Sequence, residues 1–203
     1  MEYLLDQILI KYSPQKILVV GIDGLGGSGK STIVNSLKQL LQNNNYKTVV
    51  LHIDDFINKR DIRYNISNEE WYCYYNIQWR YDYLIKEILY PIKKSTEIDK
   101  QIEIYDKEND TYYLEHTRIP IGSILLLEGV FLQRKEVEPY LDYIIYIQVP
   151  KDVRLSRVIC RDKYIGDIED IKLKYEKRYF PAEDKYIKEY SPAVNADLII
   201  NNI

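Results

Sequence analysis

The chain has 203 residues, of which 46% are hydrophobic and 29% charged, and its formal net charge is −3. These values predict one domain with a sizeable core, and the slightly negative charge argues against a general nucleic-acid binder, which needs a basic surface to displace counterions. No apolar run reaches membrane-spanning length and the N-terminus carries no secretion signal, so we expect a cytoplasmic protein that does not enter membranes.

The first predicted elements are a strand, a glycine-rich turn and a helix. Residues 16–23 form a short apolar run that is typical of a buried strand. Residues 32–43 carry apolar side chains at helical spacing. Between them, residues 24–31 read Gly-Leu-Gly-Gly-Ser-Gly-Lys-Ser, which is the pattern G-x-x-x-x-G-K-S. With both flanks in place, the alternative of a loop that merely turns is disfavoured.

This turn predicts a binding site for the phosphates of a nucleoside triphosphate. Its backbone N–H groups and the positive end of the following helix are aimed at one anion. Lys30 can reach the terminal phosphates, and the hydroxyl of Ser31 can ligate magnesium. We therefore expect ATP and Mg²⁺ as cofactors, although the turn does not distinguish ATP from GTP. The predicted ATP-binding residues of the turn and helix are Gly24, Gly26, Gly27, Ser28, Gly29, Lys30, Ser31 and Thr32.

Four further apolar runs predict strands. Each run is almost continuously apolar, and helical segments separate them, which is typical of a parallel sheet covered on both faces. The sequence therefore predicts an α/β fold. The runs cover residues 48–53, 123–127, 143–149 and 197–200.

Residues 56–120 are too many for a simple crossover connection between two parallel strands, so they predict an insertion. Aromatic residues recur every three or four positions from 68 to 90, which predicts one or two helices whose rings usually pack in a core. Residues 102–114 alternate around a polar tip at 106–110, which predicts a β-hairpin. Such an insertion beside a phosphate-binding turn could clamp a second substrate.

Acidic residues follow two of the predicted strands. Asp54 and Asp55 end one strand and Glu128 ends another, and ligands of parallel sheets bind beyond these carboxyl ends. A carboxylate there can hold magnesium, usually through water, or accept a proton from an attacking hydroxyl. We predict Asp54 as the general base and Glu128 as the magnesium residue. Asp55 could exchange roles with Asp54, and a strand-end acid can also serve as a helix cap.

Residues 152–164, after the fourth predicted strand, are expected to form a helix with three arginines on one face. Arg154, Arg157 and Arg161 lie at i, i+3 and i+7. Guanidinium groups stay charged and match phosphate oxygens in pairs. We predict that Arg154 and Arg157 bind ATP, and that Arg157 and Arg161 take part in catalysis together with Lys30 and Asp54. The alternative is a solvated face whose arginines pair with Asp152 and Asp162.

The histidines and cysteines carry no predicted chemistry. His52 lies within a predicted strand, where packing or a hydrogen bond is its usual role, and no role is assigned to His116. Cys73 and Cys160 are far apart with no C-x-x-C pattern, so we expect two partly buried reduced thiols and no metal cage.

Together these motifs resemble the uridine kinase-like branch of the P-loop kinases, which also includes phosphoribulokinase and one pantothenate kinase type. The resemblance implies a P-loop NTPase fold with a five-stranded parallel sheet of order 2-3-1-4-5, and transfer of the ATP γ-phosphate to a small molecule's hydroxyl. It also implies an acceptor-binding insertion at 56–120 and an arginine lid at 151–166 within a single kinase domain at 1–203. The matching segments are 24–31, 54–56, 105–106, 127–129, 154–162, and 196–200 after Pro192.

The resemblance extends less fully to the acceptor site. The family's sugar-binding Phe-Asp pair falls on Tyr75-Asn76, and its base-reading hairpin histidine falls on Asp110. With Asp54, we predict Tyr75, Asn76 and Tyr105 as acceptor-binding residues. The leading prediction is a kinase of a nucleoside such as uridine. The alternatives are a kinase of a non-nucleoside metabolite, such as a vitamin precursor or a sugar phosphate, and a non-catalytic ATP-binding sensor. A homo-oligomer is left open.

Overall fold

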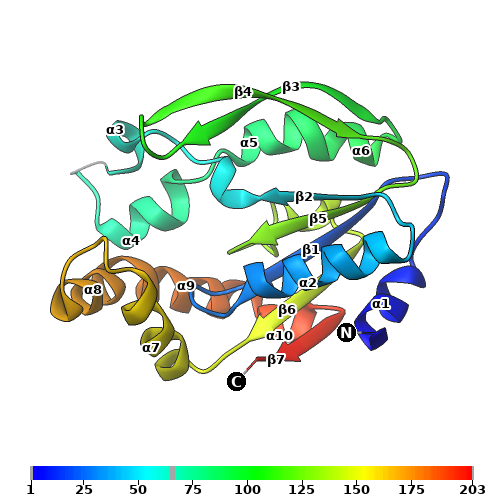
Figure 1. The fold of residues 1–203 in the computed structure, drawn as a ribbon. Helices are drawn as coiled ribbons and strands as arrows, with labels where there is room; N and C mark the ends of the chain where they lie inside the picture. The colour runs from blue at the N-terminus through cyan, green and yellow to red at the C-terminus, as the bar shows by residue number, and fades with distance from the viewer. Residues whose placement is uncertain (1, 65–66, 203) are drawn as a thin grey trace.

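A five-stranded parallel sheet forms the centre of the computed structural model, which describes residues 2–64 and 67–202 (Figure 1). Its spatial order is β2-β5-β1-β6-β7, with every neighbouring pair parallel. Numbered along the chain without the hairpin, this order is 2-3-1-4-5, so the predicted fold class and strand order are confirmed. The strands are β1 (Leu18–Gly24), β2 (Thr48–His52), β5 (Ile124–Gly129), β6 (Tyr143–Gln148) and β7 (Leu198–Asn201).

Helices cover both faces of this sheet, because successive strand residues point to opposite sides. On one face, Leu18, Val20 and Ile22 of β1 pack in a core with α1 (Glu2–Leu9) and α2 (Lys30–Asn43). On the other face, a larger core contains Val19 together with residues of the insertion and of α9 (Phe180–Tyr190). The short α10 (Pro192–Asn195) leads from α9 to the edge strand β7.

The insertion forms two helical segments and a hairpin, as predicted. The short α3 (Arg60–Arg63) precedes them. In the first segment, α4 (Glu70–Tyr72) continues into a π-helical turn (Cys73–Ile77). The second consists of α5 (Tyr81–Leu84), a π-helical turn (Ile85–Leu89) and α6 (Tyr90–Lys93). The hairpin pairs β3 (Ile98–Asp106) with β4 (Thr111–Ile119), and it crosses over α5 and α6 in Figure 1. Its turn follows Asp106, as the polar tip predicts.

The arginine-bearing segment ends earlier than predicted. Helix α7 (Lys151–Arg161) stops three residues before Tyr164, and a new helix begins after a non-helical stretch that includes Gly166. This is α8 (Ile168–Lys174), where Asp167 accepts hydrogen bonds from the first-turn N–H groups and Asp170 reaches back to the Asp167 N–H. A π-helical turn (Tyr175–Tyr179) joins α8 to α9.

The register of the sheet brings the predicted site residues to one edge. His52 is paired with Glu128, and Asp23 is paired with Gly129, so β1, β2 and β5 end at the same level. The glycine-rich turn leaves β1 there, and a single 3₁₀ turn (Ile53–Asp55) leaves β2. A second 3₁₀ turn (Glu138–Tyr140) precedes β6. Within the described residues, every helix is too short or too polar to cross a bilayer.

Candidate active site

A cavity of about 440 Å³ opens where β1, β2 and β5 end. Its walls come from the glycine-rich turn, the ends of β2 and β5, the insertion, and the segment from α7 to α9. The structure therefore brings ten of the predicted site residues together: Gly26, Gly27, Gly29, Lys30, Ser31, Thr32, Asp54, Glu128, Arg157 and Arg161.

The glycine-rich turn needs glycine at two positions because of both conformation and space. Gly27 and Gly29 have φ angles of +78° and +86°, which side chains rarely adopt. A Cβ on Gly27 would lie 2.8 Å from the backbone oxygen of Arg154, and one on Gly29 would lie 2.5 Å from Asn202 Nδ2. Gly24 and Ser28 do not line the cavity: Gly24 ends β1, and Ser28 is fully buried within the turn.

Lys30 is a buried cation surrounded by negative charge. Its side chain lines the cavity, the residue is only 8% exposed, and Nζ donates to the Leu25 carbonyl at 3.1 Å. Burial lowers the pKa of Lys30, and the carboxylates of Glu128, Asp23 and Asp54 oppose that shift. An ammonium group desolvated in this way interacts strongly with an incoming polyanion.

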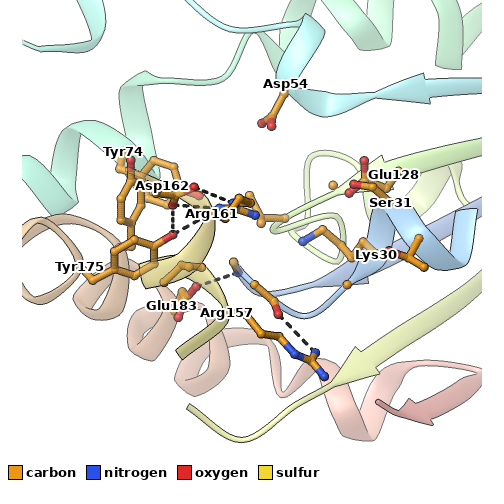
Figure 2. A pocket seen from close by; sticks show the side chains of 18 of the residues that line it. Lys30, Ser31, Asp54, Tyr74, Glu128, Arg157, Arg161, Asp162, Tyr175 and Glu183 are labelled. Atoms are coloured by element: carbon orange, nitrogen blue, oxygen red, sulfur yellow. Dashed lines mark hydrogen bonds and ion pairs between the residues drawn. The ribbon is translucent and has the colours of Figure 1, made fainter. Parts of the chain in front are cut away.

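The two acids after β2 point to different places. Asp54 lines the cavity, and Figure 2 shows its carboxylate across the open space from Lys30. Asp55 is not among the lining residues; burial raises its pKa and the nearby His52 lowers it. Geometry thus favours Asp54 over Asp55 as the residue that can reach a ligand. The sequence left the choice open because a 3₁₀ turn gives no periodic signal over two residues.

Glu128 and Ser31 lie together beside Lys30 (Figure 2). Glu128 Oε2 is 2.6 Å from His52 Nδ1, and this hydrogen bond is the main reason why the pKa of His52 is raised. Mg²⁺ keeps several waters and phosphate oxygens, so the hydroxyl of Ser31 and the remaining oxygen of Glu128 fit it. Among the described residues, no cluster of three or more His, Cys, Asp or Glu side chains offers a separate metal cage.

Arg157 and Arg161 reach the cavity from α7. Arg161 is held by Asp162, with Nε–Oδ1 and NH2–Oδ2 distances of 2.6 and 3.0 Å, and this carboxylate raises the pKa of Arg161. Tyr175 donates a further hydrogen bond to Asp162 at 2.8 Å. Arg157 instead donates to the backbone oxygen of Asn202 at 3.1 Å and lies near that of Gly27. Both guanidinium groups could turn toward a phosphate.

Arg154 lies beneath the glycine-rich turn, outside the cavity lining. It donates to the Gly26 oxygen at 2.9 Å and to Glu183 Oε2 at 2.8 Å, while Glu183 Oε1 accepts the Gly26 N–H at 2.9 Å. Arg154 and Glu183 are 4% and 2% exposed. This pair binds both the backbone N–H and the backbone oxygen of Gly26. Any contribution of Arg154 to ATP binding would therefore be indirect, through the conformation of the glycine-rich turn. The sequence did not reveal the pair, because Glu183 lies 29 residues further along the chain.

We expect Arg154→Met to lower the free energy of unfolding by about 3–5 kcal/mol, because it leaves Glu183 buried without its cation. Burial already raises the pKa of Glu183 and Arg154 holds it down, so the variant's Glu183 pKa should rise further. A carboxyl group whose pKa is raised in the folded state destabilises the fold when it is ionised. The loss of unfolding free energy should therefore be larger at pH 8 than at pH 5. Urea unfolding at both pH values measures this. The control is Lys177→Met, which removes an exposed cation; equal losses in the two variants would contradict the assignment.

The predicted acceptor residues of the insertion lie away from the cavity. Tyr75 is buried and its hydroxyl donates to Glu189 at 2.8 Å, and Asn76 is exposed and donates to its own helix. Tyr105 is buried and donates to Asp110 at 2.6 Å. Their contact with an acceptor stays a prediction. The cavity wall instead contains residues that the sequence did not single out as ligand contacts: Tyr74, Gln78, Asp162, Tyr164, Tyr175, Tyr179 and Glu183.

Comparison with known proteins agrees with this geometry. Residues 19–203 match the model of the "Phosphoribulokinase / Uridine kinase family". A uridine kinase of Staphylococcus aureus strain JH9 is 28% identical over 196 residues, which cover 90% of this chain and 86% of that protein. The solved structure of a possible uridine kinase from Bacillus stearothermophilus has a TM-score of 0.81 and 32% identity, over 98% of this chain and 96% of that one.

A more distant structure shares the fold alone. A candidate fructose transport system kinase from Silicibacter sp. TM1040 has a TM-score of 0.80 at 16% identity, over 98% of this chain and 97% of that one. The family match covers the glycine-rich turn, both strand-end acids and the arginine helix that together form the cavity. The chain therefore belongs to the phosphoribulokinase/uridine kinase family and is a P-loop kinase.

Proposed function

We propose that this chain transfers the γ-phosphate of ATP to a hydroxyl group of a small metabolite, and that a nucleoside such as uridine is the acceptor. The observation that carries the proposal is the placement of Lys30 and Asp54 across one cavity from each other. The similarity to the Staphylococcus aureus uridine kinase supports the nucleoside.

The glycine-rich turn and α2 would form the phosphate end of the site. Its N–H groups and Lys30 would hold the β- and γ-phosphates, and Ser31 and Glu128 would hold Mg²⁺ directly or through water. When bound, Mg²⁺ neutralises charge on the phosphate oxygens. The hydrogen bond from His52 would hold the Glu128 carboxylate in a fixed orientation for this role.

Asp54 would act at the acceptor end. It would orient the acceptor hydroxyl and take its proton, as that oxygen bonds to the γ-phosphorus and the bond to the ADP oxygen breaks. Arg157 and Arg161 would cover the migrating phosphoryl group, and fixed positive charge of this kind is the main source of rate in phosphoryl transfer.

An ADP-release assay with a panel of hydroxyl compounds, followed by mass spectrometry of the products, tests the proposal. We expect acceptor-dependent ADP release and a phosphorylated product, with uridine the best substrate. Tight ATP binding with no phosphorylated product from any acceptor would instead support the sensor.

One observation favours a non-nucleoside acceptor as the second candidate. Asp110, which takes the place of the family's base-reading histidine, accepts the Arg60 N–H at 3.0 Å and the Tyr105 hydroxyl. The Arg60 contact fastens the hairpin tip to α3 and the Tyr105 contact lies within the hairpin, so this carboxylate is committed within the protein. A vitamin precursor or sugar phosphate that outcompetes uridine in the same panel would establish this candidate.

A further inference from the structure

Gln78 is a fixed part of the cavity wall. It is 7% exposed and lies directly after the π-helical turn that carries Tyr74. Its N–H donates to the Cys73 oxygen at 2.9 Å, and its carbonyl accepts the Asn58 N–H at 2.8 Å. Because the backbone is held on both sides, the side chain projects from a defined position. Tyr74 marks this wall in Figure 2, opposite Ser31 and Glu128.

Arg178 determines which end of the Gln78 amide faces the cavity. A guanidinium NH2 group of Arg178 donates to Gln78 Oε1 at 2.7 Å. A guanidinium group has no hydrogen-bond acceptor, so the amide oxygen must face Arg178 and the Nε2 group must face away from it. Since Gln78 lines the cavity and Arg178 does not, Nε2 is the polar end of the side chain that is available to a ligand.

Arg178 is also an unusual buried charge. It is 1% exposed, and no carboxylate within residues 2–64 and 67–202 forms a salt bridge with it. Its other contacts are the Glu70 carbonyl at 3.2 Å and the rings of Tyr64, Tyr74 and Tyr179, whose centroids lie 4.5, 5.3 and 6.0 Å away. Aromatic faces stabilise a cation without neutralising it. Its field therefore polarises the Gln78 amide and strengthens the Nε2 hydrogens as donors.

We infer that Gln78, held by Arg178, binds a carbonyl or oxyanion oxygen of the acceptor molecule. This inference rests on the proposed kinase activity and specifies its acceptor: one hydroxyl at Asp54 and one oxygen without a hydrogen at Gln78. A pyrimidine base carbonyl supplies such an oxygen, and so does the phosphate of a sugar phosphate or the carboxylate of a hydroxy acid. A hydroxyl oxygen can also accept from Nε2, but it carries less negative charge than an oxyanion and its own hydrogen then needs a second acceptor, so a molecule that offers only hydroxyl groups binds less well there.

The first test uses the full chain with ATP and four acceptors: uridine, ribose 5-phosphate, glycerate and glycerol. Uridine offers a neutral carbonyl oxygen, whereas ribose 5-phosphate and glycerate offer oxyanions. Glycerol offers hydroxyl groups only. We expect at least one of the first three to be phosphorylated and glycerol to be turned over at least 100-fold less efficiently in kcat/KM. Efficient turnover of glycerol would overturn the inference while the kinase activity stands. No product from any of the four would count against both.

The second test changes the donor to an acceptor. Gln78→Glu keeps the size and pairs with Arg178, but turns a carboxylate oxygen toward the cavity. We expect the KM of the preferred acceptor to rise 10- to 100-fold while the KM of ATP changes less than twofold. Gln78→Met, which removes the donor without adding charge, should raise the acceptor KM by a smaller factor. The control is Gln101→Glu, the same change at an exposed hairpin position. An unchanged acceptor KM in both Gln78 variants would overturn the inference.

Discussion

Lys30→Ala is expected to lower kcat/KM by about 1,000-fold or more, because it removes the cation that we propose faces the migrating phosphoryl group from the phosphate end. Lys30 is buried in the cavity wall, and its side chain donates to the turn itself through the Leu25 carbonyl. No other described lysine lines the cavity, so the chain has no ammonium group that could replace it there. The substitution should therefore raise the free energy of the transition state more than that of the bound ground state.

Acceptor-dependent ADP release and calorimetric titration with ATP measure these two effects separately. The matched control is Lys38→Ala, which removes a lysine from the same helix two turns further on, away from the cavity. Circular dichroism should show the same helix content in both variants. If Lys30→Ala kept a tenth or more of the kcat/KM of the unchanged protein, Lys30 would not be the residue that stabilises the transferring group.

The placement of the proposed phosphate-binding residues in one cavity could be predicted from the sequence because most of them are contiguous. The glycine-rich turn, Lys30 and Ser31 occupy eight consecutive residues between a strand and a helix, so local pattern fixes their geometry. Asp54 and Glu128 lie far apart in sequence, yet the rule that parallel strands present their carboxyl ends at one edge brought them together. The same register explains the His52–Glu128 contact, which the sequence analysis did not anticipate.

The part of the cavity that we propose binds the acceptor could not be predicted in the same way. Gln78 and Arg178 are 100 residues apart, and each belongs to a segment whose π-helical turn shifts the helical period. A spacing argument placed Arg154 with Arg157 and Arg161, but the partner that holds it under the turn comes from another helix. Likewise, the aromatic residues of the insertion were expected in the core. Tyr74 does pack there, and it also lines the cavity.

Asp54→Asn is expected to reduce kcat by about 100- to 10,000-fold, the range that general-base catalysis contributes, while the KM of ATP changes little. An amide keeps the size and can still accept a hydrogen bond from the acceptor hydroxyl, but it cannot take the proton.

The variant Asp55→Asn decides between the two neighbouring acids. Because Asp55 lies outside the cavity lining, its replacement should lower kcat less than threefold. Asp61→Asn, at an exposed position of α3, controls for the loss of one negative charge. Rapid-quench measurement of the first turnover separates the chemical step from product release. A large loss in Asp55→Asn with near-normal kcat in Asp54→Asn would transfer the role of base to Asp55, because only the group that accepts the proton should slow that first turnover.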